Sequence, residues 1–368
     1  MTTKIPLSYT PIDPEAIKKV LDQYAGRSHE NIISDFEASL SEFTKARHVV
    51  ALNSGTAAIH LALKAIGVGA NDEVLVSTFT YVATVNPILY LGAKPVFIDV
   101  EEQSWNMDPE LLESAIKDRL KEGIKPKAIL VVHTYGMPAM MQEIMAISQR
   151  HEIPVVEDAA EALGSKIGNK CVGTFGKIGI LSFNNNKILT TYGGGAVLTN
   201  DEDIAQKIVF WSGQSRESKL YYEHKELGYN YRMGPINAAI GLSKIDKLEN
   251  EINYRRKCFE NYRHSLSQFG VQFQIEKSGV FSNRWLSAAS LHQDLDIDLV
   301  SRNLENQGIE TRRVWNPMHM QPMFKLFSYY SQNDMSVRLF SNSVCLPFSE
   351  NNIQSIVFFI EKYLGYKG

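Results

Sequence analysis

Short apolar segments alternate with helical patterns through the first two-thirds of the chain, and this alternation constrains the fold more than any other feature. The segments at 48–53, 73–77, 94–100, 128–133 and 153–158 are rich in β-branched residues and carry no regular polar face. Strands of this kind are covered on both sides, and helices between them indicate parallel neighbours. We therefore predict the α/β fold class, with a mostly parallel mixed sheet that has helices on both faces and a smaller C-terminal α+β domain.

Two later regions break the alternation. The segments 178–183 and 194–199 have the pattern of strands joined by a loop rather than by a helix. One long helical stretch then dominates 234–270, as expected of a helix that bridges two domains. We predict a large domain over residues 1–248, which includes the N-terminal segment, and a smaller domain over 249–368.

The residues that follow the strands form the candidate site, because ligands of parallel sheets bind beyond the carboxyl ends of the strands. Lys187 lies between an apolar strand and the glycine run 193–195, where the backbone can approach a ligand closely. A lysine that is partly desolvated there could attack an aldehyde as a nucleophile. The alternative is a surface lysine beside a flexible turn.

Asp158 ends an apolar strand and is followed by small residues. A carboxylate at this place could pair with a buried cation, such as the protonated nitrogen of a pyridine ring. The alternative is an aspartate that caps the next helix. Glu157 is a second candidate carboxylate, but the strand period of two turns its side chain to the opposite face.

The segment NSGTAA at 53–58 follows a strand and begins a helix. Backbone N–H groups at a helix N-terminus, together with the hydroxyls of Ser54 and Thr56, form an anion site that suits a phosphate. An ordinary N-cap is the alternative. The segment matches neither GxxxxGK(S/T) nor GxGxxG, which disfavours an ATPase or a reductase with a dinucleotide cofactor.

These three weak signals describe one site when they are combined in chain order. They supply a phosphate cradle, an aspartate for a ring nitrogen and a lysine for an aldehyde, and an aromatic segment at 78–81 adds a ring. Pyridoxal 5′-phosphate requires this set of groups. The sequence therefore predicts this cofactor.

Composition excludes several other classes of protein. The chain has 38 Lys and Arg against 41 Asp and Glu, a net charge of −3, which argues against a nucleic-acid partner. The N-terminus lacks the apolar core of a signal peptide, and no apolar run approaches the roughly 18 residues that span a bilayer. Cys171, Cys258 and Cys345 are far apart, so neither a disulfide framework nor a metal knuckle is expected. We expect a cytoplasmic protein with no metal and no membrane partner.

Eight segments of the chain also resemble, in order, the blocks of one family. They are NSGTAAIHLAL, GAKPVFIDVE, WNMDP, VVHTYGMP, VVEDAAEALGS, SFNNNKILTTYGGG, GYNYRMGPINAAIG and GIETRRVWNPMH. The chain resembles the DegT/StrS group of sugar-nucleotide aminotransferases, which are fold-type I pyridoxal-phosphate enzymes. The resemblance runs nearly from end to end.

The resemblance implies roles for the cofactor site. Lys187 matches the lysine that bonds to the cofactor aldehyde and carries the proton between carbon centres, and Asp158 matches the partner of the ring nitrogen. The remaining positions match the phosphate turn at Gly55 and Thr56, the phosphate hydroxyl of Ser182 and the stacking ring of Tyr81. Glu161 stands where the family often has glutamine, which leaves its contact to the cofactor ring oxygen in doubt.

Other matching residues face a partner subunit or the substrate. Asn230 matches an asparagine that reaches across a homodimer interface to the partner's phosphate, and helix packing of 228–241 is the alternative. Arg313, Trp315 and His319 are candidate substrate contacts, with core packing as the alternative. The resemblance thus implies a homodimer with active sites at the subunit interface.

The resemblance implies transamination, because one branch of the family that dehydrates its substrate has histidine in place of the lysine and this chain keeps Lys187. An amino acid, glutamate, would give its amino group to the cofactor, and a nucleotide-linked keto sugar would take it for cell-surface glycan synthesis. SFNNNKILTTYGGG resembles the variant found in enzymes that aminate C4 of UDP-4-keto-6-deoxy-N-acetylglucosamine, with Asn185 in place of a glycine. GDP- or dTDP-linked keto-deoxyhexoses are alternatives, as is a non-enzymatic sensor or scaffold on the same fold.

Overall fold

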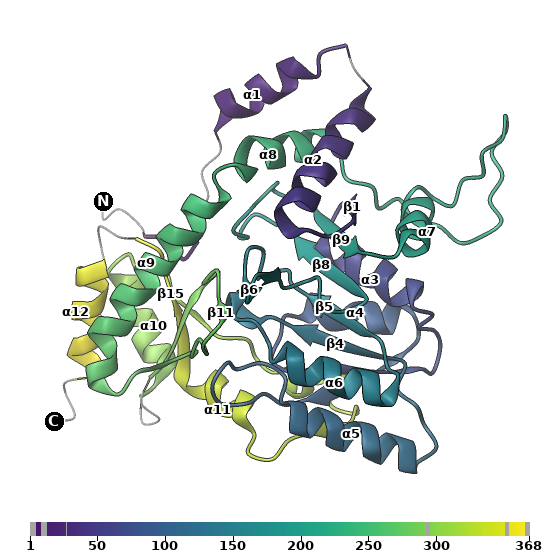
Figure 1. Cartoon of the computed structure of the whole chain (residues 1–368). Helices are drawn as coiled ribbons and strands as arrows, with labels where there is room; N and C mark the ends of the chain where they lie inside the picture. The colour runs from purple at the N-terminus through teal and green to yellow at the C-terminus, as the bar shows by residue number, and fades with distance from the viewer. Residues whose placement is uncertain (1–4, 9–12, 27, 292–294, 350–352, 365–368) are drawn as a thin grey trace.

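The computed structural model describes residues 5–8, 13–26, 28–291, 295–349 and 353–364 (Figure 1). Much of the N-terminal segment, on which the prediction of no signal peptide rests, lies outside the described residues. Among the described residues, no helix combines the length and the apolar character needed to cross a bilayer.

An eight-stranded sheet forms the centre of the molecule, in the order β1-β9-β8-β5-β4-β2-β3-β14. Only β9 runs antiparallel to its neighbours, so the predicted mostly parallel mixed sheet is confirmed. The strands are β1 (His48–Leu52), β2 (Glu73–Ser77), β3 (Lys94–Ile98), β4 (Ala128–Val132), β5 (Val155–Asp158), β8 (Ile178–Ser182), β9 (Gly195–Thr199) and β14 (Tyr329–Tyr330).

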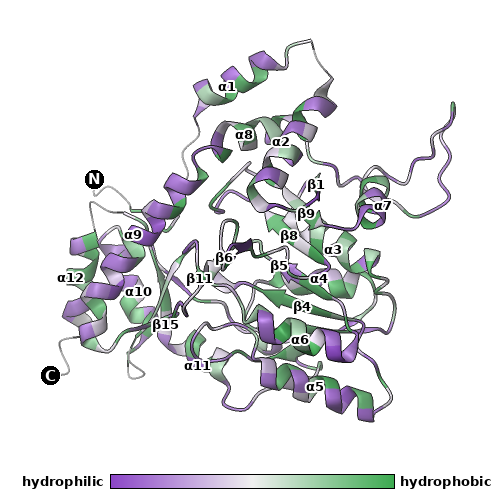
Figure 2. Ribbon diagram, viewed as in Figure 1, coloured by the Kyte–Doolittle hydropathy of each residue, from purple (hydrophilic) through white to green (hydrophobic). Residues whose placement is uncertain are grey.

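Helices cover both faces of this sheet, as the doubly apolar strands predict. One face packs against α3 (Gly55–Ala65), α4 (Val82–Tyr90) and α7 (Glu202–Ser212). The other face packs against α5 (Pro109–Lys121) and α6 (Met141–His151), and at the β1 end against α2 (His29–Thr44) and α8 (Pro235–Ile245). The central strands are mostly hydrophobic in Figure 2.

The C-terminal part forms an α+β unit with its own core. Its antiparallel sheet has the order β10-β12-β15-β13. The elements of this unit are α9 (Leu248–Leu266), β10 (Gln272–Phe273), β12 (Ser287–Ser290), α10 (Ile297–Asn306), β13 (Arg312–Arg313), α11 (Met335–Asn342), β15 (Ser343–Leu346) and α12 (Ile353–Leu364). The remaining elements are α1 (Pro14–Gln23), a small sheet of β6 (Lys166–Ile167), β7 (Lys170–Cys171) and β11 (Val280–Phe281), and short 3-10 helices at Thr134–Gly136, Ser267–Phe269, Met318–Met320 and Pro322–Phe324.

The prediction of one continuous helix over 234–270 is wrong, because α8 ends at Ile245 and α9 begins at Leu248. The two helices serve different cores. Ala238 and Ala239 of α8 pack beneath α2, whereas Phe259 and other later residues of α9 pack in the C-terminal core. A break between them lets each helix turn its apolar face to its own core.

The predicted division into two domains at residue 248 stays a prediction. Several strand pairings join residues on the two sides of this position. β14 joins β3 at the edge of the large sheet, and β11 pairs with β6. Ile5 forms a parallel bridge with Ile309, so the N-terminal segment lies against the C-terminal unit. The two parts of the chain are thus interlocked at their boundary.

Candidate active site

The carboxyl ends of β1, β5 and β8 meet at one edge of the large sheet and surround a cavity of about 440 Å³. Residues from all three loops line it, as does the C-terminal unit through two side chains. The lining includes Ser54, Gly55, Thr56, Tyr81, Thr84, Asp158, Glu161, Ser182, Lys187, Arg312 and Trp315. The cavity therefore brings together the lysine, the aspartate and the helix start that the sequence predicts.

The start of α3 forms the end of the cavity that suits a phosphate. Ser54 is the N-cap, and its Oγ accepts a hydrogen bond of 3.1 Å from the Ala57 amide. The amides of Gly55 and Thr56 lie in the first turn, where no acceptor exists within the helix. A Cβ on Gly55 would lie 3.0 Å from the Ser182 Cβ, so the glycine lets β8 come close. Backbone donors and a hydroxyl thus meet at the positive end of the helix.

Asp158 is 4% exposed at the end of β5 and points toward α4. Its Oδ2 accepts a hydrogen bond of 2.8 Å from the Thr84 hydroxyl, and its Oδ1 accepts one of 3.1 Å from the Ala160 amide. Burial raises the pKa of this carboxyl. A cation close to the carboxylate would offset that desolvation, and a protonated ring nitrogen is such a cation.

Glu157 faces the other side of the sheet, as the strand period predicts. Its carboxylate accepts hydrogen bonds from His133 Nε2 at 3.0 Å and from the amides of Gly173 and Gly176 at 2.8 and 2.6 Å. These donors pair with both oxygens of the Glu157 carboxylate in the core below the cavity. The choice between the two carboxylates therefore falls on Asp158.

Lys187 is largely buried, since 13% of its side chain is exposed, and the alternative of a surface lysine is excluded. Its Nζ lies 3.8 Å from Glu161 Oε1 and 4.0 Å from the centre of the Trp285 ring. Burial lowers the pKa of Lys187, and the charges of Glu161 and Asp158 oppose this shift. A lysine in such a place can exist as a neutral nucleophile and can exchange protons.

Glu161 is 6% exposed, and its Oε2 accepts a hydrogen bond of 2.7 Å from the Tyr135 amide. Burial raises the pKa of Glu161 to about 7. Near neutral pH this carboxyl therefore exchanges readily between its protonated and ionised forms. It lies on the same side of the cavity as the lysine amine.

Tyr81, the predicted stacking ring, and Trp315, a predicted substrate contact, both line the cavity. Tyr81 is 53% exposed, and its ring centre lies 5.3 Å from that of Trp315. The Trp315 amide donates a hydrogen bond of 2.7 Å to the Tyr135 hydroxyl. Two aromatic rings thus stand at the mouth of the cavity, where a planar ligand could stack.

The structure does not bring Arg313 or His319 into the cavity. Arg313 Nε donates to Asp298 at 2.6 Å, because β13 turns neighbouring side chains to opposite faces and it is Arg312 that lines the cavity. His319 Nδ1 lies 2.7 Å from the Thr78 hydroxyl, and its ring stacks on Tyr329.

Asn230 is exposed and lies outside this chain's cavity, with its backbone oxygen accepting a 3.1 Å hydrogen bond from the Asn53 side chain. Its contact with a partner's phosphate stays a prediction. The nearby Arg232 pairs with Glu37 at 3.2 Å, which is a packing role within the chain.

The sequence interpretation missed Thr84, Tyr135, Trp285 and Arg312. Thr84 follows Thr80 by four residues, and this spacing places both hydroxyls on one side of the backbone, 2.7 Å apart. No local pattern identifies Tyr135 or Trp285, because each reaches the site from a distant loop. Among the described residues, no group of histidine, cysteine or acidic side chains could hold a metal ion.

The residues of the cavity fit pyridoxal 5′-phosphate. The helix start with Ser182 would hold the phosphate, Asp158 the ring nitrogen and Lys187 the aldehyde carbon. The burial of Asp158 at the end of β5 supports this fit, since a buried carboxylate is stabilised by a nearby cation.

Comparisons with known proteins agree with this geometry. A model of the DegT/DnrJ/EryC1/StrS aminotransferase family matches residues 12–355. EpsN of Bacillus subtilis (strain 168) is 42% identical over 87% of this chain and 84% of its own. A GDP-perosamine synthase of Escherichia coli O157:H7 is 36% identical over 86% of this chain and 85% of its own.

A solved structure gives the same result for the fold. A crystal structure of a DegT DnrJ EryC1 StrS aminotransferase from Brucella abortus has a TM-score of 0.88 and 31% identity, and covers 96% of this chain and 95% of that chain. The predicted fold class, aminotransferase activity and pyridoxal-phosphate cofactor are confirmed at the level of the family. The chain belongs to the DegT/DnrJ/EryC1/StrS aminotransferase family.

Proposed function

We propose that the chain moves the amino group of L-glutamate onto the keto carbon of a nucleotide-linked sugar for cell-surface glycan synthesis. The observation that carries this proposal is that Lys187, Asp158 and the first turn of α3 line one cavity. A sensor or scaffold would not need a lysine that is desolvated beside two carboxyls, so this arrangement favours an enzyme.

Each group in the cavity has a separate task in this reaction. The cofactor, when bound, supplies an electron sink for the carbon that loses or gains a proton. Asp158 holds the ring nitrogen in its protonated form, and the first turn of α3 with Ser182 holds the phosphate. Lys187 takes the proton from the amino-acid carbon through its Nζ and returns one in the second half of the reaction. Tyr81 and Trp315 exclude water from one side of the cavity.

Arg312 is the side chain that suits an anionic part of the substrates. Its side chain is 67% exposed and pairs with Glu310 at 3.1 Å, while it also lines the cavity. An arginine binds carboxylate and phosphate groups with two parallel hydrogen bonds. It could bind the glutamate carboxylate or the sugar diphosphate.

For the sugar we propose UDP-4-keto-6-deoxy-N-acetylglucosamine, with amination at C4. The segment SFNNNKILTTYGGG at 182–195 supports this choice, because it resembles the variant found in enzymes that aminate this sugar at C4. The segment lines the cavity through Ser182, Asn184 and Lys187. A GDP-linked 4-keto-6-deoxy sugar is the second candidate, which the 36% identity to a GDP-perosamine synthase favours.

We also propose that the protein is a homodimer in the cytoplasm. The segment between α7 and α8 projects from the body (Figure 1), and it exposes Leu220, Tyr222 and Leu227 by 70% or more. Apolar side chains on such a segment mark an interaction surface, and a second copy is the partner proposed.

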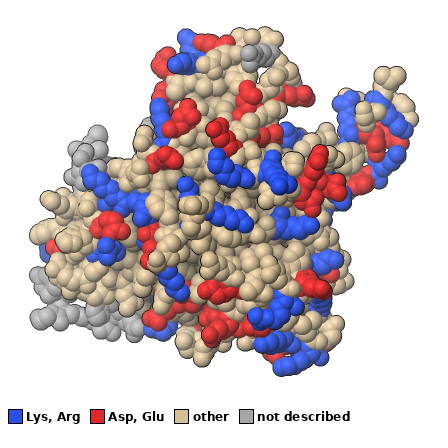
Figure 3. Space-filling model, in the orientation of Figure 1, with Lys and Arg blue, Asp and Glu red and all other residues tan. Residues whose placement is uncertain are grey.

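The three cysteines are buried and form no disulfide, which is consistent with a reducing compartment. Figure 3 shows charges of both signs interspersed on the visible face.

A substrate panel tests the proposed activity. Purified protein is given glutamate and UDP-, GDP- or dTDP-linked 4-keto sugars, and the amino sugar is detected by mass spectrometry. We expect yellow protein, borohydride fixation of the cofactor on a peptide containing Lys187, and turnover with the UDP sugar. Full turnover by Lys187→Ala would contradict the assigned role, and sedimentation of the wild type as a monomer would contradict the dimer.

A further inference from the structure

The amine of Lys187 lies between an aromatic ring and a carboxylate that come from different parts of the chain. Its Nζ is 4.0 Å from the centre of the Trp285 ring and 3.8 Å from Glu161 Oε1. Trp285 precedes β12 in the C-terminal unit, whereas the other two residues follow strands of the large sheet. The proposed reaction gives roles to Lys187 and Asp158 but none to Trp285.

Hydrogen bonds fix the position of Trp285 on three sides. Its indole Nε1 donates at 2.8 Å to the carbonyl of Asn186, the residue directly before the lysine. Its carbonyl accepts a 2.7 Å hydrogen bond from Arg255, which is 1% exposed and pairs with Glu251. The indole is therefore tied to the loop that carries the lysine, and the backbone of Trp285 is tied to α9.

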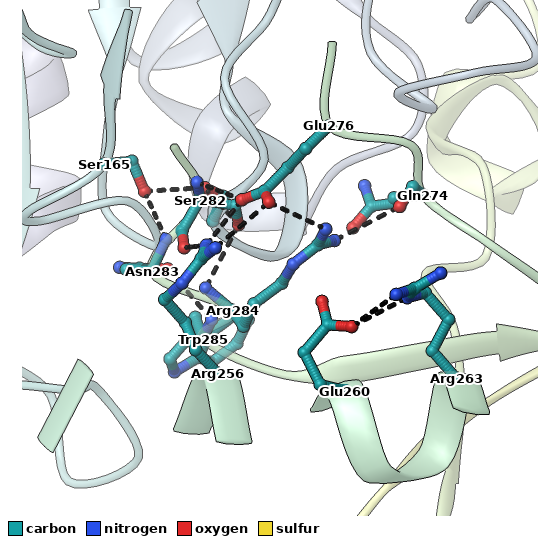
Figure 4. A network of polar contacts seen from close by, with 11 residues as sticks. Ser165, Arg256, Glu260, Arg263, Gln274, Glu276, Ser282, Asn283, Arg284 and Trp285 are labelled. Carbon is teal, nitrogen blue, oxygen red and sulfur yellow. Dashed lines mark hydrogen bonds and ion pairs between the residues drawn. The ribbon is translucent and has the colours of Figure 1, made fainter. Parts of the chain in front are cut away.

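One side chain links the backbone of Trp285 to the backbone of Glu161. Asn283 Oδ1 accepts a 2.9 Å hydrogen bond from the Trp285 amide, while its Nδ2 donates to the Glu161 carbonyl at 3.0 Å. The Asn283 amide donates to Ser165 Oγ at 2.9 Å, and this contact belongs to the network in Figure 4. A Cβ on Gly136 would lie 1.8 Å from Asn283 Oδ1, so only glycine leaves room for this link.

The same network holds the backbone beside the ring in an unfavourable conformation. Arg284 has a φ of 51°, a left-handed value that non-glycine residues adopt only when their surroundings enforce it. Its guanidinium lies between the Gln274 carbonyl and Glu276 (Figure 4). The Trp285 ring also stacks against Tyr135 and Trp315, at 6.3 and 6.4 Å between centres. The orientation of the indole is thus set by the protein.

We propose that Trp285 is a positioning residue, whose indole face acts with Glu161 to hold the ammonium of Lys187 whenever the lysine is not bonded to the cofactor. The face of an indole carries negative electrostatic potential and attracts an ammonium, more strongly when both are desolvated. The amine gains a proton from one substrate carbon and gives one to the other, so its proton count returns to its starting value in each turnover. This inference rests on the role of Lys187 in the proposed function.

The proposal predicts that loss of the indole face makes the ammonium less stable. The other charged groups around the amine are Glu161 and Asp158, which favour the ammonium, and Arg312, which lines the same cavity. These groups remain in Trp285→Leu and Trp285→Phe. We expect the pKa of Lys187 to fall by about 0.5–1 unit in Trp285→Leu and by less in Trp285→Phe, which keeps an aromatic face.

Competitive labelling of the full-length protein loaded with pyridoxamine 5′-phosphate measures this pKa. Acetic anhydride labels the free amine as a function of pH, and mass spectrometry quantifies the peptide that contains Lys187. Trp211→Leu is the matched control, because Lys64 Nζ lies 5.0 Å from the Trp211 ring centre at a distant site. We expect this control to leave the pKa of Lys187 unchanged.

An unchanged pKa of Lys187 in folded Trp285→Leu would overturn the proposal. If the leucine variant does not fold, Trp285→Phe decides in its place, and a pKa equal to that of the wild type has the same consequence. The labelling needs no sugar substrate. Failure of the proposed activity, seen as no turnover with any keto sugar, is therefore distinguishable from failure of this inference.

Discussion

The hydroxyl of Thr84 donates a 2.8 Å hydrogen bond to Asp158 Oδ2, and this contact connects α4 to the carboxyl end of β5. It fixes the direction in which the carboxylate points and lowers its pKa against the effect of burial. The orientation and the pKa of the Asp158 carboxylate therefore depend on α4, a helix that the sequence interpretation did not include in the site.

Thr84→Val is expected to weaken pyridoxal-phosphate binding by about 5- to 10-fold, because a buried carboxylate loses one donor worth about 1 kcal/mol or more. A titration followed by visible absorbance measures the dissociation constant. Thr44→Val is the matched control, since Thr44 donates to the Leu40 carbonyl within α2. An equal loss of affinity in both variants would show that the effect is not local.

Glu161→Gln is expected to change the pH dependence of stability. The pKa of Glu161 is raised from 4.5 to about 7, so the folded chain keeps a proton that the unfolded chain releases between these values. This stabilisation is complete below the unfolded pKa and is lost as the pH rises through 7. From about pH 5 to pH 8 the free energy of unfolding of the wild type should fall relative to the variant, by up to about 3 kcal/mol.

Urea unfolding of the cofactor-free protein across this pH range measures the difference. The exposed Glu152→Gln serves as the control and should follow the wild type. Parallel pH curves for the wild type and Glu161→Gln would show that Glu161 does not titrate in this window.

Arg312→Ala and Arg313→Ala should differ in their effect on substrate binding. Arg312 lines the cavity, whereas Arg313 pairs with Asp298 outside it. Loss of a charge-assisted hydrogen bond to an anionic substrate should raise KM by roughly 10- to 100-fold in Arg312→Ala. Steady-state kinetics with glutamate and with the keto sugar would identify which substrate it binds. A larger KM effect in Arg313→Ala would favour the residue chosen from the sequence.

Gly55→Ala should weaken cofactor binding at the phosphate end. Its Cβ would lie 3.0 Å from the Ser182 Cβ, so β8 and the start of α3 must move apart. Such crowding costs about 1–3 kcal/mol, which corresponds to a loss of affinity of about 5- to 150-fold. Isothermal titration with pyridoxal phosphate measures it. Gly69→Ala is the control, because its Cβ would have no neighbour within 4 Å, and it should bind like the wild type.

Local patterns account for much of the site. The strand over 73–77 and the helix that begins after Ser54 lie where the sequence predicts them, and the Ser54 hydroxyl caps that helix through the Ala57 amide. The period of two separated Asp158 from Glu157, since the strand is long enough to alternate clearly. The same period could not show whether Arg312 or Arg313 faces the cavity, because the strand β13 that holds them has only two residues.

The sequence by itself determined the alternation of strands and helices in the first two-thirds of the chain, because N-caps, glycine runs and apolar periodicity act over a few residues. It did not show the break between α8 and α9. That information places Asp158, Lys187 and the Ser54–Thr56 turn at strand ends. Only the tertiary structure decided that Trp285 reaches Lys187 and that Asn283 connects Trp285 to the Glu161 backbone. Trp285 and Asn283 lie far along the chain from Lys187 and Glu161, and the contacts between them depend on how the C-terminal unit packs on the large sheet.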